Sequence, residues 1–229
     1  MKQYSIDPSL ISLEEFKDLT ANRKMLPGRV VLHEQIDKRF CQLKHSGMVT
    51  LVDVLRILGT KSKIQSLAIQ TGLPEDYLLL LKREAGSYMA KPFPLSSFPG
   101  IPYEYVELLK SRGIKNTKNF YEQVQSDQQQ AQLAESTGIP VYRLKELFTL
   151  CDLSRITGVG GVFARVLYEA GINSSAAFAG TDASTLLERC RKVIEKHGYA
   201  AGKLGEEDIS YGINYAKVIV ACDNKSDKK

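Results

Sequence analysis

The sequence predicts an all-α protein made of short helices in tandem repeats, without a significant β-sheet. Apolar residues recur at the helical spacing, as Leu144, Leu147, Phe148 and Cys151 do at i, i+3, i+4 and i+7. Stretches of the chain return at fixed offsets, which indicates repeated structural units. We find no run that alternates apolar and polar residues as a half-buried strand would. Together these three observations favour a helical repeat protein.

The repeats set the order of the elements. Residues 43–48 match 109–114, and residues 67–74 match 133–140, both at an offset of 66. Residues 99–117 match 157–175 at an offset of 58. The difference of 8 falls in residues 86–98, which contain Pro92 and Pro94, so we expect an inserted loop there. The chain should therefore contain three related helical units.

Capping signals place the individual helices. Ser12 and Glu15 fit a capping box that opens a helix through about Thr20. Within the units, one set of glycines suits helix C-termini, a second set stands in Thr-Gly turns between helices, and the prolines just after these turns suit the start of the next helix. These residues are Gly47, Gly113 and Gly171, then Gly72 and Gly138, then Pro74 and Pro140. A last helix is predicted from Asp208 to about Ala221.

The predicted domain organisation follows from these units. Residues 1–98 form an N-terminal helical region with a degenerate hairpin unit and the proline-containing loop. Residues 99–222 form two hairpin units, 99–151 and 152–222, and residues 223–229 form a disordered polar tail.

The third unit opens with the most informative stretch, Ile156 to Ala164. Gly158 and Gly160 flank the apolar Val159, and both glycines permit backbone angles that other residues resist. The small Ala164 lets the following helix approach the turn closely. Such a turn presents N–H groups at a helix start, where the helix dipole also favours anions.

These residues resemble the helix-hairpin-helix motif, whose pattern is apolar-x-Gly-apolar-Gly-x-x-x-Ala. The resemblance implies contact with the sugar-phosphate backbone of DNA or RNA without sequence specificity. The amides of the hairpin would bind the phosphate, Arg165 would supply a cation, and Arg155 is a weaker candidate. Some hairpins of this kind also bind sodium or potassium through backbone carbonyls. The implied binding residues are Gly158, Val159, Gly160, Gly161, Arg165 and Arg155.

A longer stretch, residues 152–172, is also similar to a family of bacterial helix-hairpin-helix proteins of unknown function. This resemblance covers most of the chain from about Pro27 onward and implies no particular activity.

The other two hairpins lack parts of the pattern. In the second, Pro102 replaces the second glycine and removes an N–H, while Val106 and Glu107 stand at the alanine and arginine positions. In the first, residues 33–36 contain no glycine. We therefore expect these two hairpins to serve packing, and only the third to bind phosphate.

Charge supports nucleic-acid binding only weakly. The net charge is +5, but residues 152–229 contain 11 basic and 10 acidic residues. Affinity for nucleic acids depends heavily on cations at the phosphates. Arg189, Arg191 and Lys192 form a local basic cluster on the next helix, although a solvated helix face explains them better. The near-neutral segment keeps a different function open, a helical scaffold for protein partners with purely structural hairpins.

Other function classes find little support in the sequence. The four cysteines and three histidines have no metal-ligand or redox spacing, and we expect the thiols to be reduced and mostly buried. We see no nucleophile elbow and no phosphate loop, so we expect neither an enzyme nor a cofactor or metal. No run is long and apolar enough for a membrane, and no signal segment is visible, which makes the cytoplasm the expected location. A helix-turn-helix at the Thr-Gly turns is disfavoured because Leu78 to Leu81 leave no polar reading face.

Overall fold

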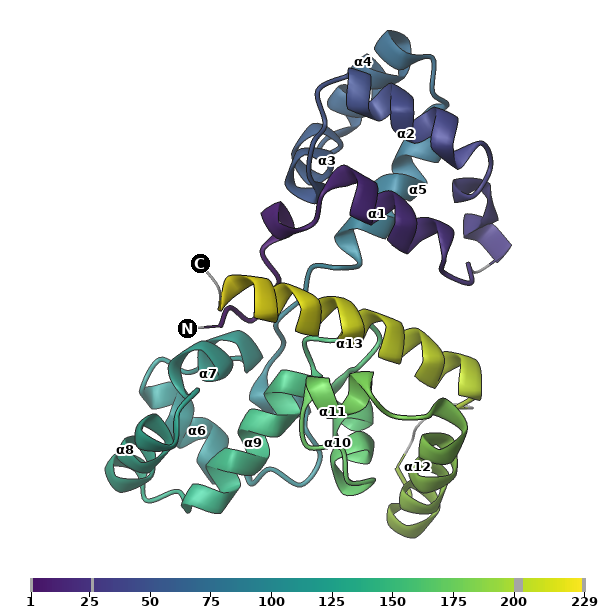
Figure 1. Ribbon diagram of the computed structural model, residues 1–229. Coiled ribbons are helices and arrows are strands. Elements are labelled where there is room, and N and C mark those ends of the chain that lie inside the picture. Colours follow the sequence, from purple (N-terminus) through teal and green to yellow (C-terminus); the bar gives the residue numbers. More distant parts are fainter. Residues whose placement is uncertain (1, 26, 200–203, 228–229) are drawn as a thin grey trace. The chain divides into compact units, whose positions relative to one another are not determined.

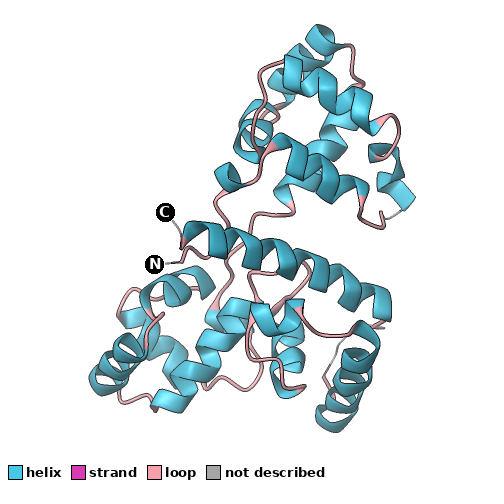
Figure 2. Cartoon of the chain, in the orientation of Figure 1, coloured by secondary structure: helices cyan, strands magenta, loops and turns pink. Residues whose placement is uncertain are grey.

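The computed structural model describes residues 2–25, 27–199 and 204–227, and these residues form an all-helical protein. Figures 1 and 2 show helices joined by short loops. Within the described residues, extended backbone pairs only at two isolated bridges, Ser12 with Thr50 and Pro94 with Asn116. The predicted all-α class is confirmed. None of the helices described is both long and apolar enough to cross a bilayer.

The chain divides into two compact units. An N-terminal unit comprises residues 7–89, and a C-terminal unit comprises residues 90–229 together with residues 1–6. The division falls nine residues before the boundary at 98 that the sequence predicts. The loop after residue 89 belongs to the C-terminal unit because Leu95 and Phe98 are buried, and because Thr117 N–H donates to the carbonyl of Phe93 at 3.0 Å.

In the N-terminal unit, the predicted capping box at Ser12 and Glu15 is present and opens α1. Phe16 of α1 packs against Phe40 of α2, with 5.8 Å between the ring centroids. At the end of α5, the buried carboxylate of Glu84 forms ion pairs with Arg23 and Arg29. The helices are α1 (Leu13–Ala21), α2 (Ile36–His45), α3 (Leu51–Ile57), α4 (Lys61–Thr71) and α5 (Glu75–Gly86), with 3-10 turns η1 (Pro8–Leu10) and η2 (Pro27–Leu32).

The C-terminal unit contains eight α-helices among its described residues. Helix α9 contacts α7, α8 and α10, whereas the long α13 packs on α11 and α12. Figure 1 shows α13 lying across the rest of the unit. The elements are η3 (Leu95–Ser97), α6 (Tyr103–Ser111), α7 (Thr117–Gln123), α8 (Asp127–Thr137), α9 (Val141–Leu153), α10 (Gly161–Glu169), α11 (Ser175–Ala179), α12 (Ala183–His197) and α13 (Glu206–Ser226).

The same local geometry returns along the chain at the offsets seen in the sequence. Gly47, Gly113 and Gly171 follow α2, α6 and α10, with φ angles of 89°, 82° and 86°. Gly72 and Gly138 cap α4 and α8, both with a φ of 73°. These left-handed angles explain why glycine stands at each position.

The predicted disordered tail at 223–229 needs correction. Helix α13 continues through Ser226, about five residues beyond its expected end. The extra turn is stabilised because Asp223 accepts hydrogen bonds from the guanidinium of Arg155 at 2.7 and 3.0 Å. A polar sequence suggested fraying, but a buried partner from another element holds this end of the helix. Residues 228 and 229 lie outside the described residues.

The burial of the four cysteines can be compared with the prediction that the thiols are mostly buried. Cys151, Cys190 and Cys222 are buried as expected, whereas Cys41 is exposed. Burial raises the pKa of the Cys190 thiol to about 11 and that of Cys151 well above its ordinary value. Since the thiolate is the reactive form, we expect only Cys41 to react rapidly with a thiol reagent at pH 8, and all four cysteines to react in urea. A second fast thiol in the folded protein would contradict this burial pattern.

Candidate phosphate-binding hairpin and the adjoining pocket

The third hairpin connects α9 to α10 by a tight turn. Helix α9 ends at Leu153, Gly158 adopts a φ of 87°, and Gly160 is the N-cap of α10. Val159 is buried between the two exposed glycines, and its N–H donates to the carbonyl of Ile156 at 3.0 Å. The turn therefore places one apolar side chain in the core and leaves glycine backbone at the surface.

The first turn of α10 offers hydrogen-bond donors. Within the described part of the chain, the N–H groups of Gly160, Gly161 and Val162 donate to no acceptor, as is general for the first turn of an α-helix. Around Gly160 there is open space, with no atom within 4 Å of the position that a Cβ would take. An anion could approach this backbone without moving a side chain.

Gly161 has a packing role that its place in the motif did not predict. A Cβ on Gly161 would lie 2.1 Å from the carbonyl oxygen of Ser97, well inside van der Waals contact. The end of η3 therefore packs directly on the backbone at the start of α10. The second and third hairpin segments support each other at this point.

Arg165, which the resemblance presents as the cation for phosphate, faces the interior. It is 4% exposed, forms an ion pair with Glu146 of α9, and donates through Nε to the carbonyl of Pro99 at 2.7 Å. The guanidinium also lies beside Gly100, where a Cβ would come within 3.6 Å of Nη2. Arg165 thus joins α9, α10 and the second hairpin, and it is not an exposed cation.

Arg155, the weaker candidate, is buried still more deeply, at 2% exposed. Its guanidinium donates to Asp152 at 3.0 Å, to Asp223 at 2.7 Å and to the Tyr121 hydroxyl at 2.8 Å. Burial disfavours the charged form, but hydrogen bonding to Asp223 and the nearby negative charges prevail and raise the pKa of Arg155 above its ordinary value. Arg155 therefore fixes the base of the hairpin from inside.

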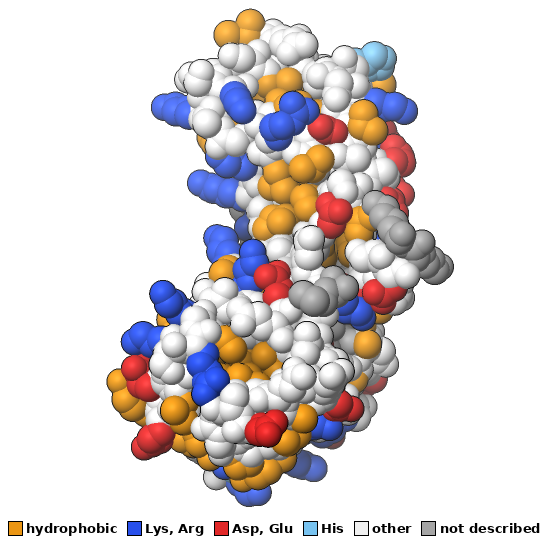
Figure 3. Space-filling model, turned by 90° about the vertical axis from the view of Figure 1, so that its left-hand side faces the viewer, with side chains coloured by type: hydrophobic (Ala, Val, Ile, Leu, Met, Phe, Trp, Pro, Cys, Tyr) orange, Lys and Arg blue, Asp and Glu red, His pale blue; other side chains and the backbone are white. Residues whose placement is uncertain are grey.

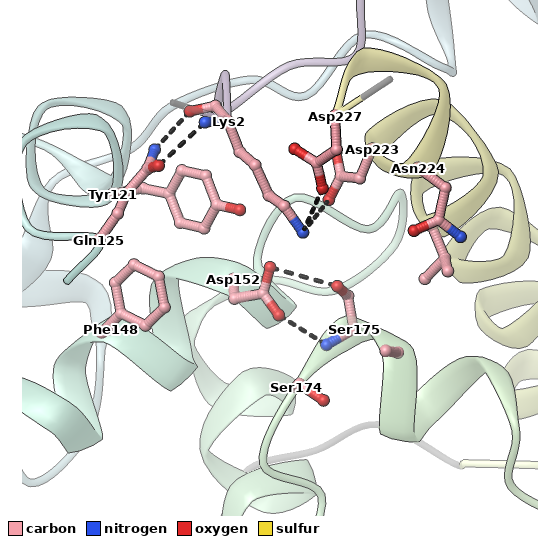
Figure 4. A pocket seen from close by; sticks show the side chains of 12 residues that line it. Lys2, Tyr121, Gln125, Phe148, Asp152, Ser174, Ser175, Asp223, Asn224 and Asp227 are labelled. Atoms are coloured by element: carbon pink, nitrogen blue, oxygen red, sulfur yellow. Dashed lines mark hydrogen bonds and ion pairs between the residues drawn. The ribbon is translucent and has the colours of Figure 1, made fainter. Parts of the chain in front are cut away.

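A polar pocket of about 490 Å³ lies on the other side of these ion pairs (Figure 4). Asp152 stands at its floor, where its carboxylate accepts hydrogen bonds from Ser175 N–H at 2.6 Å and from Ser175 Oγ at 3.2 Å. Tyr121 and Phe148 stack along one side at 5.2 Å between centroids. The ammonium of Lys2 lies above, 3.9 Å from Asp223 and 3.8 Å from Asp227.

Sequence reasoning missed the part that the N-terminal residues play here. Lys2 and Tyr4 contact side chains that stand more than a hundred positions later in the chain. No local motif indicates such a contact. An isolated aromatic residue in a polar stretch was the only available signal.

These features define an all-α domain that the comparisons assign to a family without a known activity. Residues 99–218, more than half of the chain, match the family described as "Domain of unknown function (DUF4332)", and the chain belongs to this family. The matched region runs from the second hairpin into α13, so the N-terminal unit lies outside it. No curated protein and no solved structure matches the chain significantly.

Proposed function

We propose that the protein is a non-enzymatic nucleic-acid-binding protein that contacts the phosphate backbone of DNA or RNA without sequence specificity through its third hairpin. The observation that carries this proposal is the exposed glycine backbone at the start of α10, whose N–H groups have no acceptor within the described residues. Such groups, together with the helix dipole, favour phosphate oxygens. We also propose that the protein acts in the cytoplasm.

The buried arginines change how this binding would work. The amides of Gly158, Gly160 and Gly161 would contact the phosphate, whereas Arg155 and Arg165 hold the hairpin in shape from within. Neutral amides neutralise no phosphate charge, so we expect weak binding whose affinity falls only slightly with salt. This differs from the steep dependence that two exposed arginines would give.

The geometry of the other hairpins supports a tandem helix-hairpin-helix origin. Gly100 and Gly158, which precede α6 and α10, have φ angles of 78° and 87°. Before α2, Gln35 takes a left-handed conformation with a φ of 47°, which is unusual for a residue other than glycine. Gln35 is itself the N-cap of α2, whereas Gly100 and Gly158 stand two residues before the N-caps of their helices. We infer that the first hairpin forms a different turn, and that Pro102 removes the donor from the second.

A pair of substitutions at Gly160 tests the role of the amide. Gly160→Pro removes the N–H at a φ of −83°, which proline tolerates, and Gly160→Ala keeps the N–H in the same open space. A hydrogen bond to a charged group contributes roughly 1.5–3 kcal/mol, so we expect the proline variant to bind at least tenfold more weakly and the alanine variant within about twofold of wild type. Fluorescence anisotropy with labelled duplex DNA, single-stranded DNA and RNA at several salt concentrations measures both.

Thermal melts of the two variants show whether the fold is intact. If wild type binds no nucleic acid at low salt, or if folded Gly160→Pro binds as tightly as Gly160→Ala, the proposal is rejected. A shallow salt slope for wild type would agree with amide contacts, and a steep slope would require exposed cations elsewhere on the surface.

A helical protein-interaction scaffold is the second candidate, and one observation favours it. Among the described residues of the C-terminal unit, the strongly exposed large apolar side chains all lie on α6 and the first turn of α9. Figure 3 shows hydrophobic side chains gathered along the lower edge of this unit. The exposed apolar residues on α6 and α9 are Tyr103, Leu108, Val141 and Tyr142. A scaffold would bind no nucleic acid, and Gly160→Pro would leave its interactions unchanged.

A further inference from the structure

Residues 2–6 lie against the C-terminal unit in the way that a bound peptide would. Three of its side chains hydrogen-bond the backbone of this segment. Lys2 N–H donates to Gln125 Oε1 at 2.9 Å, and Gln125 Nε2 donates back to the Lys2 carbonyl. Tyr4 N–H donates to Glu122 at 3.0 Å, and Arg155 Nε donates to the Tyr4 carbonyl at 3.0 Å. These contacts recognise peptide backbone, whatever the side chains on it.

Alternate side chains of the segment serve as anchors. Tyr4 is 1% exposed, and its hydroxyl hydrogen-bonds to Ser154 Oγ and accepts from Thr117 Oγ1, both at 2.9 Å. Its ring meets Tyr121 edge to face at 6.0 Å. Gln3, between the two anchors, is exposed. Lys2 and Tyr4 are thus held by the C-terminal unit, while the side chain between them faces solvent.

The first anchor, Lys2, is a cation that lies beside a pocket. Figure 4 shows the Lys2 side chain reaching toward Asp223 and Asp227. Its ammonium stays 3.8 to 3.9 Å from these carboxylates, too far for a good hydrogen bond. The pocket of about 490 Å³ beside it is within the size range of ligand sites, about 300–1,000 Å³. A guanidinium, which pairs with a carboxylate through two donors, would suit this space.

Charge points to the same kind of ligand. Asp152, Asp223 and Asp227 meet the cations of Arg155 and Lys2, which leaves one net negative charge on the group. Without Lys2 the group would carry two. A ligand with a positive charge would therefore replace the charge that is lost from the group when Lys2 is displaced.

We propose that the C-terminal unit is a receptor for a short peptide with Lys or Arg at one position and an aromatic residue two positions later, and that residues 2–6 fill this receptor in cis. A ligand in trans then binds only the fraction of molecules whose own segment is released, so the wild-type affinity is reduced by that fraction. The receptor uses side chains other than the hairpin amides, and the proposal does not depend on nucleic-acid binding.

The test uses a labelled synthetic peptide with the sequence of residues 2–6, Lys-Gln-Tyr-Ser-Ile, titrated against the full chain by fluorescence anisotropy. Tyr4→Ala in the protein removes the buried anchor and releases the segment. We expect this variant to bind the peptide at least tenfold more tightly than wild type. Gln3→Ala, at the exposed residue between the two anchors, is the matched control and should behave as wild type does.

Two further experiments test the cation position and keep the test valid if Tyr4→Ala does not fold. A peptide with Glu in place of Lys should bind the Tyr4→Ala chain at least tenfold more weakly, and adding Asp227→Asn should weaken the original peptide. Lys2→Glu in the full chain leaves the buried Tyr4 anchor in place and should also raise peptide affinity. If Lys2→Glu and folded Tyr4→Ala both bind no better than wild type, or if the Glu peptide binds equally well, the proposal is overturned.

Discussion

Replacing Arg155 by alanine is expected to destabilise the protein by roughly 3–5 kcal/mol, because removing one partner of a buried ion pair leaves the other charge uncompensated. Two carboxylates, Asp152 and Asp223, would lose their partner in surroundings that are mostly shielded from water, and Tyr4 would lose a backbone hydrogen bond. Urea unfolding followed by circular dichroism measures the loss through the transition midpoint.

The exposed Arg191 provides the control for this experiment. Arg191→Ala should change the free energy of unfolding by less than about 0.5 kcal/mol, as surface substitutions usually do. Adding Asp223→Asn to Arg155→Ala should recover part of the loss, since one uncompensated charge is then gone. A loss below about 1 kcal/mol for Arg155→Ala would show that the network contributes little.

Gly161→Ala is expected to cost about 1–3 kcal/mol or more, since the new methyl group would overlap the Ser97 carbonyl and force the end of η3 away from α10. Gly160→Ala, one residue earlier, meets no atom within 4 Å and should cost only the loss of a favourable N-cap glycine, about 1 kcal/mol or less. Adjacent glycines thus provide the variant and its control. Equal unfolding midpoints for the two variants would contradict the close packing at Ser97.

The helical elements could be predicted from the sequence because their signals are local. The capping box at Ser12 and Glu15 spans one helical turn, and the left-handed glycines, such as Gly113 and Gly171, stand directly at helix ends. Each signal involves neighbouring residues and a backbone angle that few residue types adopt. The class of fold follows from such signals without knowledge of the packing.

The environment of the candidate site depended on contacts that no local pattern contains. The motif gives the position of Arg165 but not the direction of its side chain, which is decided by Glu146 on the preceding helix. Arg155 likewise turns inward because Asp223 reaches it from α13, 68 residues later. A near-neutral charge balance was consistent with paired arginines, although it did not identify the pairs.

The division of the chain has a consequence for the order in which the protein folds. Residues 7–89 form a complete helical unit inserted between two parts of the other, so the C-terminal unit is discontinuous in sequence. Chains emerge from the ribosome N-terminus first, and domains generally fold as units. The inserted unit can fold while the rest is still being synthesised, whereas Lys2 and Tyr4 await partners that are translated later. The ion pair between Arg155 and Asp223 then closes the larger unit only after α13 has been synthesised.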